Sequence, residues 1–253
     1  MTEILDASYP LAGFLSDWIP TAAALLTRLS LLVLMLPGIG DAVIPVRIRL
    51  ALAIALVGIL LPLAPVGPET VSVPLLLGEA FAGFTLGFGA RVFIFVLSMT
   101  GTIIAQALSL SQVFGLATQG DSSSLLSSAL VLAGSALFLT ADFEVVLVRQ
   151  LVDNLDAVPP GFVVSMDPGA VASTMTRLAA DAVELAVTLG IPFLVLNFSY
   201  YLVLGFLNRA MPQLMITFVG LPAITLSGLV LFMLGVAALL SVWLTRVSGA
   251  LAP

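Results

Sequence analysis

The sequence predicts an all-α integral membrane protein with about six long apolar helical segments and a central irregular, plug-like loop. Hydrophobic residues make up 60% of the 253 residues and charged residues only 9%, which lies outside the range of ordinary soluble domains. The mean hydropathy of +1.22 agrees with this. Apolar runs recur along the chain, and several are long enough to cross a hydrocarbon core of ~30 Å as helices that rise about 1.5 Å per residue.

Turns and charged loops separate the segments. The first follows a short acidic tail and ends at a turn that begins with Pro37, and the second follows a loop with Arg47 and Arg49 and is short for a straight span. The last has no charge and is longer than one bilayer, so tilt or a break must take up the excess. Residues 149–169 form a hydrophilic connection, and we expect residues 1–253 to form a single membrane domain. The predicted segments are residues 18–36, 50–65, 75–97, 125–148, 170–207 and 214–244.

The stretch from Glu79 to Asp121, which begins in the third segment, changes character midway. Gly83 and Gly87 lie four residues apart on one helical face, a spacing that lets another membrane helix approach closely. No side chain between Val92 and Gly120 can ionise. Amides and hydroxyls nevertheless alternate with large apolar residues in its second half, which is unsuitable for contact with lipid.

This uncharged second half leads into a central loop at about residues 106–124, which we interpret as a gate. Apolar side chains can fill a narrow passage, amides can bond neighbouring backbone, and glycines allow movement. A buried structural loop without gating is the alternative. The gating residues predicted from this pattern are Gln106, Leu108, Leu110, Gln112, Val113, Phe114, Gly115, Leu116 and Gln119.

Five charged residues fall in or beside apolar segments, where an unpaired charge costs at least ~2.5 kcal/mol. We therefore expect them to be paired or in contact with water, either as structural ion pairs or along a proton or ion pathway. Arg177 and Asp181 fit an ordinary i, i+4 pair on an amphipathic stretch that begins at Ala170. The five residues are Arg28, Glu79, Arg91, Asp181 and Glu184.

Composition excludes several kinds of chemistry. The chain has no His and no Cys, which excludes Ser/His hydrolysis and Cys or His metal sites. Gly38-Ile39-Gly40-Asp41 matches the GxGD pattern of intramembrane aspartyl proteases, but no Tyr-Asp pair supplies a second carboxylate. All eight basic residues are Arg and the net charge is −6, which argues against nucleic acid as a partner. We expect neither catalytic residues nor cofactors.

Short motifs follow one another in a characteristic order from about Leu36 to Leu231. They are Met35-Leu36-Pro37-Gly38, Ile44-Pro45-Val46-Arg47, Gly78-Glu79 with Gly83, Leu86-Gly87-Phe88 and Arg91, Gly101 with Gln106, Pro159-Pro160-Gly161, Leu204-Gly205-Phe206-Leu207-Asn208-Arg209, Pro212-Gln213-Leu214 and Val219-Gly220-Leu221-Pro222. No single motif is specific, but in this joint order they resemble the FliR family of flagellar export-gate proteins and its injectisome relatives.

The resemblance implies a structural and gating subunit of the type III protein export gate in the bacterial inner membrane, at the flagellar basal body. It implies FliP-like and FliQ-like subunits, an FlhB-like protein, unfolded export substrates and membrane lipid as partners. It also implies a FliP-like part at residues 18–148 and a FliQ-like helical hairpin at residues 170–253. An injectisome member of the same family, or a secondary transporter or channel that uses midplane charges, is the alternative.

Overall fold

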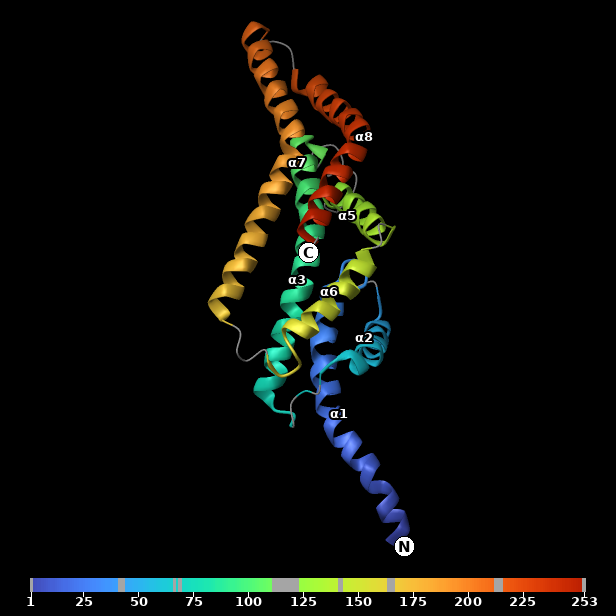
Figure 1. The fold of residues 1–253 in the computed structure, drawn as a ribbon. Helices are drawn as coiled ribbons and strands as arrows, with labels where there is room; N and C mark the ends of the chain where they lie inside the picture. Colours follow the sequence, from blue (N-terminus) through green and yellow to red (C-terminus); the bar gives the residue numbers. More distant parts are fainter. Residues whose placement is uncertain are drawn as a thin grey trace. The chain divides into compact units, whose positions relative to one another are not determined.

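A computed structural model of the chain describes residues 2–40, 44–65, 67, 70–110, 123–140, 143–162, 167–211 and 216–251. Over these ranges the chain forms α-helices joined by turns and contains no β-strand, which confirms the predicted all-α fold (Figure 1). The elements are α1 (Thr2–Met35), α2 (Val46–Leu60), the short 3-10 helix η1 (Leu61–Leu63), α3 (Val73–Ala107), α5 (Ser123–Thr140), α6 (Phe143–Ala157), α7 (Pro168–Ala210) and α8 (Ile216–Leu251).

Within the described ranges, five helical stretches are long and apolar enough to cross a membrane. The chain is thus a multi-pass membrane protein by length and composition. Two helices are longer than predicted: α1 begins at Thr2 rather than after an acidic tail, and α3 continues to Ala107 rather than ending near residue 97. The five stretches are Trp18–Met35, Val46–Leu63, Val73–Ala107, Gly169–Ala210 and Pro222–Gly249.

The prediction of one continuous fourth segment at residues 125–148 was wrong. Helix α5 ends at Thr140 and α6 begins at Phe143, so the apolar part of α5 is a shorter stretch, Leu125–Phe138. The mean hydropathy of the predicted segment does not reveal that two helices are present, because the residues at the end of α5 and at the start of α6 are both apolar.

The first half of the hydrophilic connection predicted at residues 149–169 is helical, because α6 continues to Ala157. Leu151 and Leu155 of α6 are buried, whereas Asp153 and Asp156 are exposed. A single i, i+4 pair of leucines among acidic residues is a weak sequence signal for a helix. The acidic residues therefore led to the interpretation of this stretch as a hydrophilic connection.

The chain divides into two compact units, each built from two separate stretches. Unit 1 comprises Met1–Arg91 and Asp142–Leu178, and unit 2 comprises Val92–Ala141 and Ala179–Pro253. Helices α3 and α7 contribute to both units. The likeness of residues 18–148 to FliP and of residues 170–253 to FliQ is a separate matter and stays a prediction.

The core of unit 1 lies where α1, α2 and α6 meet. Apolar side chains from all three helices are buried together there. Because α6 contributes to it, the turn that follows α6 is held close to α1. The buried members are Leu25, Leu29, Leu32, Val33, Ala53, Leu60, Ala64, Leu151 and Leu155.

In unit 2, the C-terminal half of α3 contacts α5, α7 and α8. Ser98 and Ser127 join α3 to α5 by a hydrogen bond of 2.9 Å between their hydroxyls. Gly101 of α3 lies against the backbone of Ser127, where an added Cβ would come within 2.5 Å of the Ser127 Cα. The two helices therefore cross at nearly backbone contact.

Candidate functional site

Among the charged residues of unit 1 whose side chains the structure describes, Arg28 on α1 and Glu79 on α3 are the most deeply buried, both 0% exposed. The Arg28 Nε donates to the Glu79 Oε2 over 2.7 Å. An isolated charge in such a place would be very costly, and a hydrogen-bonded pair offsets much of that cost. The two residues are 51 positions apart in sequence, so the pair joins the first membrane helix to the third.

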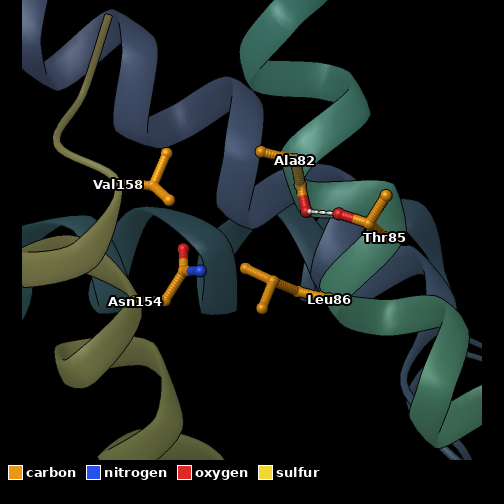
Figure 2. A pocket seen from close by; sticks show the side chains of 5 residues that line it. All are labelled: Ala82, Thr85, Leu86, Asn154 and Val158. Atoms are coloured by element: carbon orange, nitrogen blue, oxygen red, sulfur yellow. Dashed lines mark hydrogen bonds between the residues drawn. The ribbon is translucent and has the colours of Figure 1, made fainter. Parts of the chain in front are cut away.

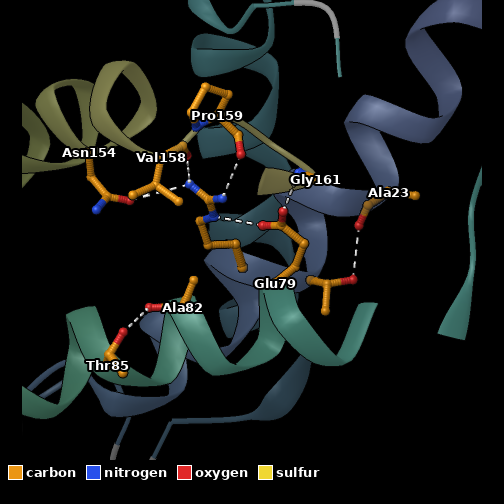
Figure 3. Close-up of polar contacts among 10 residues, drawn as sticks. Ala23, Glu79, Ala82, Thr85, Asn154, Val158, Pro159 and Gly161 are labelled. Atoms are coloured by element: carbon orange, nitrogen blue, oxygen red, sulfur yellow. Dashed lines mark hydrogen bonds and ion pairs between the residues drawn. The ribbon is translucent and has the colours of Figure 1, made fainter. Parts of the chain in front are cut away.

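The same two side chains also hold the turn that follows α6 (Figure 3). The Arg28 Nη1 donates to the Val158 carbonyl over 2.8 Å and to the Asn154 Oδ1 over 3.3 Å. The Arg28 Nη2 donates to the Pro159 carbonyl over 3.5 Å. On the other side, the Gly161 N–H donates to the Glu79 Oε1 over 2.6 Å. We call Arg28, Glu79 and the turn Val158–Gly161 the clamp.

Three glycines lie in or beside the clamp. Gly161 has φ +93°, a backbone conformation that residues with a Cβ rarely adopt. Its N–H donates to Glu79. Gly83 lies one turn after Glu79, and an added Cβ there would collide with the backbone carbonyl oxygen of Arg28. An added Cβ on Gly87 would come within 2.5 Å of the Met35 Cβ. The predicted small-residue stripe thus faces α1.

A pocket of about 190 Å³ lies beside the clamp, between α3 and α6 (Figure 2). Two of its polar atoms already have partners: the Thr85 hydroxyl donates to the Ala82 carbonyl over 2.8 Å, and the Asn154 Oδ1 accepts from Arg28. No ionisable side chain is among the described residues that line it. The lining residues are Ala82, Thr85, Leu86, Asn154 and Val158.

The geometry of the clamp suits a mechanical role. Both oxygens of Glu79 and all three nitrogens of the Arg28 guanidinium have hydrogen-bond partners within the protein. Among the described residues, no group of three or more acidic, His or Cys side chains could hold a metal. The clamp can therefore fix three chain segments relative to one another.

The beginning of the central loop lies in unit 2, at the C-terminal end of α3. Gln106 is exposed in the last turn, whereas Leu108 and Leu110 are 0% and 4% exposed. Ser109 has φ +54°, which ends the helix by turning the chain into the left-handed region. The remaining predicted gating residues, Gln112, Val113, Phe114, Gly115, Leu116 and Gln119, lie outside the described residues.

The other predicted residues are dispersed. Arg91 is half-buried on α3 and has an interaction partner. Pro37 is buried, and Gly38 takes φ +75° in the turn after α1. Pro45, just before α2, and Arg47, on α2, are exposed. Asp181, Glu184 and Arg209 are exposed on α7. Pro212 and Gln213 lie outside the described residues.

Sequence reasoning did not find Asn154, or the carbonyls of Val158 and Pro159, as partners of Arg28. Two of these three acceptors are backbone atoms, which residue identity does not reveal. The Pro159-Pro160-Gly161 motif was the available signal, since glycine after two prolines indicates a special turn.

Comparison with known proteins gives the family. The family described as "Bacterial export proteins, family 1" matches residues 19–250. The chain is 30% identical over 237 residues to the flagellar biosynthetic protein FliR of Caulobacter vibrioides, covering 89% of this chain and 92% of that protein. It is 26% identical over 205 residues to FliR of Aquifex aeolicus, covering 78% of each. The chain therefore belongs to bacterial export protein family 1, the family of the flagellar biosynthetic protein FliR, and is a component of the flagellar export apparatus.

Proposed function

We propose that this chain is a structural and gating subunit of the flagellar type III protein export gate, and that it forms part of the channel for unfolded export substrates. The observation that carries the proposal is the family match along residues 19–250, together with a relative named FliR that is matched over nearly its whole length. We place the subunit in the bacterial inner membrane at the flagellar basal body. Its chemistry is mechanical and not enzymatic.

The surface of the chain supports a role as a subunit. Large apolar side chains on α7 remain exposed, including Phe198 at 65% and Phe206 at 73%. The same helix also exposes Asp181 and Glu184. Such a mixture is unfavourable against lipid tails alone and is typical of helices that pack in part against other subunits. We propose FliP-like and FliQ-like subunits and an FlhB-like protein as these partners, with lipid around the assembly.

The gate itself is proposed to be the central loop at about residues 106–124. Its support is chemical: the stretch has no charge before Asp121, and it alternates amides and hydroxyls with large apolar residues. Apolar side chains in a narrow passage exclude water and ions, and a fixed charge would retain water and bind oppositely charged parts of a passing chain. The described start of this loop, at Leu108 and Leu110, is already buried.

The experiment that tests gating removes the apolar filling while it keeps the loop length. Residues 113–118 are replaced by a Gly-Ser stretch of equal length, and the variant is co-expressed with its FliP-like and FliQ-like partners. We expect an assembled complex that makes the membrane leaky to ions, measured by dye release or membrane potential. An assembled complex with the permeability of the wild type would contradict the gate, and failure to assemble would assign the loop to subunit association instead.

A further inference from the structure

In unit 2, the C-terminal half of α3 and the turn that ends it pack three large apolar side chains against glycines on three different helices. At each contact an added Cβ on the glycine would overlap the α3 side chain; on Gly190 it would come within 2.8 Å of the Ile103 Cγ2, and at the other two sites it would come closer. A larger residue at any of these glycines would require the facing side chain to move, so the three contacts depend on glycine in the packing seen here. The pairs are Leu97 with Gly134 of α5, Ile103 with Gly190 of α7, and Leu108 with Gly228 of α8.

Among the described residues, helix α8 donates two side-chain hydrogen bonds to the backbone of α3 and of the turn that ends it, whereas α5 donates one, from the Ser127 hydroxyl to the Ser98 carbonyl over 3.1 Å. The Trp243 Nε1–H donates to the Phe93 carbonyl over 2.8 Å, and the Thr225 hydroxyl donates to the Leu108 carbonyl over 3.1 Å. Trp243 is 0% exposed and Thr225 is 5% exposed. Two fixed points, one in the helix and one at its end, thus hold α8 along the second half of α3.

The Leu108 carbonyl lies where α3 stops. The Leu108 N–H still bonds the Ile104 carbonyl over 3.0 Å, but the Ser109 N–H bonds back to Gln106 over 3.1 Å and Ser109 leaves the helical region. The last carbonyls of a helix have no partner within the helix, and a buried carbonyl without a partner is unfavourable. The Thr225 hydroxyl supplies this partner from another helix.

Thr225 is unusual in this use of its hydroxyl. Ser227 and Thr245, elsewhere on the same helix, donate to carbonyls of α8 itself, to Ala223 and Ser241, over 2.8 Å in each case. Those bonds fix nothing outside the helix. Thr225 and Gly228 lie three residues apart and so share one face of α8, and both meet Leu108.

We propose that Thr225 and Gly228 form a seat on α8 that positions the end of α3, and with it the point from which the central loop departs. Gly228 receives the Leu108 side chain, and Thr225 binds the Leu108 carbonyl. Movement of α8 away from α3 would release both contacts together. The seat rests on the proposed function only in its consequence, since the loop that it positions is the proposed gate.

A labelling experiment tests the seat apart from the gate. The chain has no Cys, so Ser109→Cys, at a position only 6% exposed, introduces a single thiol next to Leu108. In this background, Thr225→Val removes the hydroxyl and keeps the shape, Thr225→Ser keeps the hydroxyl, and Ser227→Ala removes an exposed hydroxyl from the same helix. The full complex with its partner subunits is treated with a maleimide, and the rate of labelling is measured.

We expect Thr225→Val to raise the labelling rate about tenfold, the size that the loss of one buried hydrogen bond allows. We expect Thr225→Ser and Ser227→Ala to label at the background rate, and Gly228→Ala to label faster because its Cβ displaces Leu108. If Thr225→Val labels no faster than Ser227→Ala, the seat is overturned. If Thr225→Val prevents assembly, the seat is also overturned, because the hydroxyl would then serve the fold of the subunit.

Permeability measured on the same variants separates the two proposals. If the Gly-Ser loop variant leaks while Thr225→Val neither labels faster nor leaks, the gate stands and the seat fails. If Thr225→Val labels faster while the loop variant does not leak, the seat stands and the gate fails. Both proposals together predict that Thr225→Val labels faster and leaks.

Discussion

Glu79 accepts one hydrogen bond on each carboxylate oxygen, from Arg28 Nε over 2.7 Å and from the Gly161 N–H over 2.6 Å. One buried carboxylate thus joins α1 to the turn after α6 from its own place on α3. Because Arg28 bonds the Val158 and Pro159 carbonyls of the same turn, removing either charge affects all three segments. The clamp therefore accounts for how the backbone of the turn after α6 is held against α1 and α3.

The first prediction is that Glu79→Leu strongly destabilises the subunit. It leaves the fully buried Arg28 without its counter-charge, and removal of one partner of a buried pair costs about 3–5 kcal/mol. Glu79→Gln should destabilise the subunit less than Glu79→Leu. Its amide oxygen can still accept one of the two hydrogen bonds, although its NH2 group would then face the other N–H donor. The measurement is the Tm of the purified complex, with the order wild type, Gln, Leu. Equal Tm values for the three proteins would show that the charge contributes nothing.

The second prediction concerns removal of both charges. Arg28→Met with Glu79→Leu eliminates the unpaired charge, and apolar replacements of buried pairs are often tolerated. The Val158 and Pro159 carbonyls still lose their donor, which costs about 1–3 kcal/mol for each buried group left unsatisfied. The double variant should therefore lie between the wild type and Glu79→Leu in Tm. A double variant no more stable than Glu79→Leu would mean that the carbonyl contacts, and not the charge balance, dominate.

From the sequence we could predict that Arg28 and Glu79 each need a partner. The sequence did not show that they are each other's partner. Hydropathy places each charge in an apolar segment, and the high cost of an unpaired charge there implies a counter-charge. Which of several charges is the counter-charge depends on how helices 51 residues apart pack, and no local pattern encodes that. The Gly83 stripe is similar: its spacing predicted a close helix, and only the structure identifies α1.

Helix α6 illustrates the opposite case, in which local reasoning failed within one element. Its acidic residues favoured a loop, yet Leu151 and Leu155 enter the core beside Leu29 and Leu32 of α1. Tertiary burial of one apolar face outweighed composition here. The six gating residues from Gln112 to Gln119 lie outside the described part of the chain, so their role remains a prediction from residue chemistry and resemblance.

The third prediction is that Gly83→Ala is destabilising although alanine is the better helix former. The added Cβ would meet the backbone oxygen and carbon of Arg28, and backbone atoms cannot rotate away as a side chain can. Helices α1 and α3 must then separate, which costs about 1–3 kcal/mol, as overpacking of a close-packed site does. A lower Tm and a lower yield of the assembled complex are the expected results.

Gly89→Ala is the matched control, on the same helix and with the same change. No atom lies within 4 Å of its added Cβ, so only the helix propensity changes, in favour of alanine by up to about 1 kcal/mol. We expect a Tm equal to or slightly above that of the wild type. A similar loss in both variants would indicate a general sensitivity of α3 to its glycines and would contradict the close-contact explanation.

The last prediction is that the chain is unstable when expressed without its partner subunits. Helix α7 exposes Val187, Ile191 and Phe198 at 41%, 47% and 65%, while Asp181 and Glu184 are exposed on the same helix. Detergent or lipid can cover the apolar residues but does not satisfy the acidic ones, whereas a partner subunit can do both. Alone, the chain should aggregate or elute as a broad, protease-sensitive species in size-exclusion chromatography. Co-expression with FliP-like and FliQ-like subunits should give one sharp, protease-resistant complex, and a stable, well-folded monomer would remove most of the support for a subunit role.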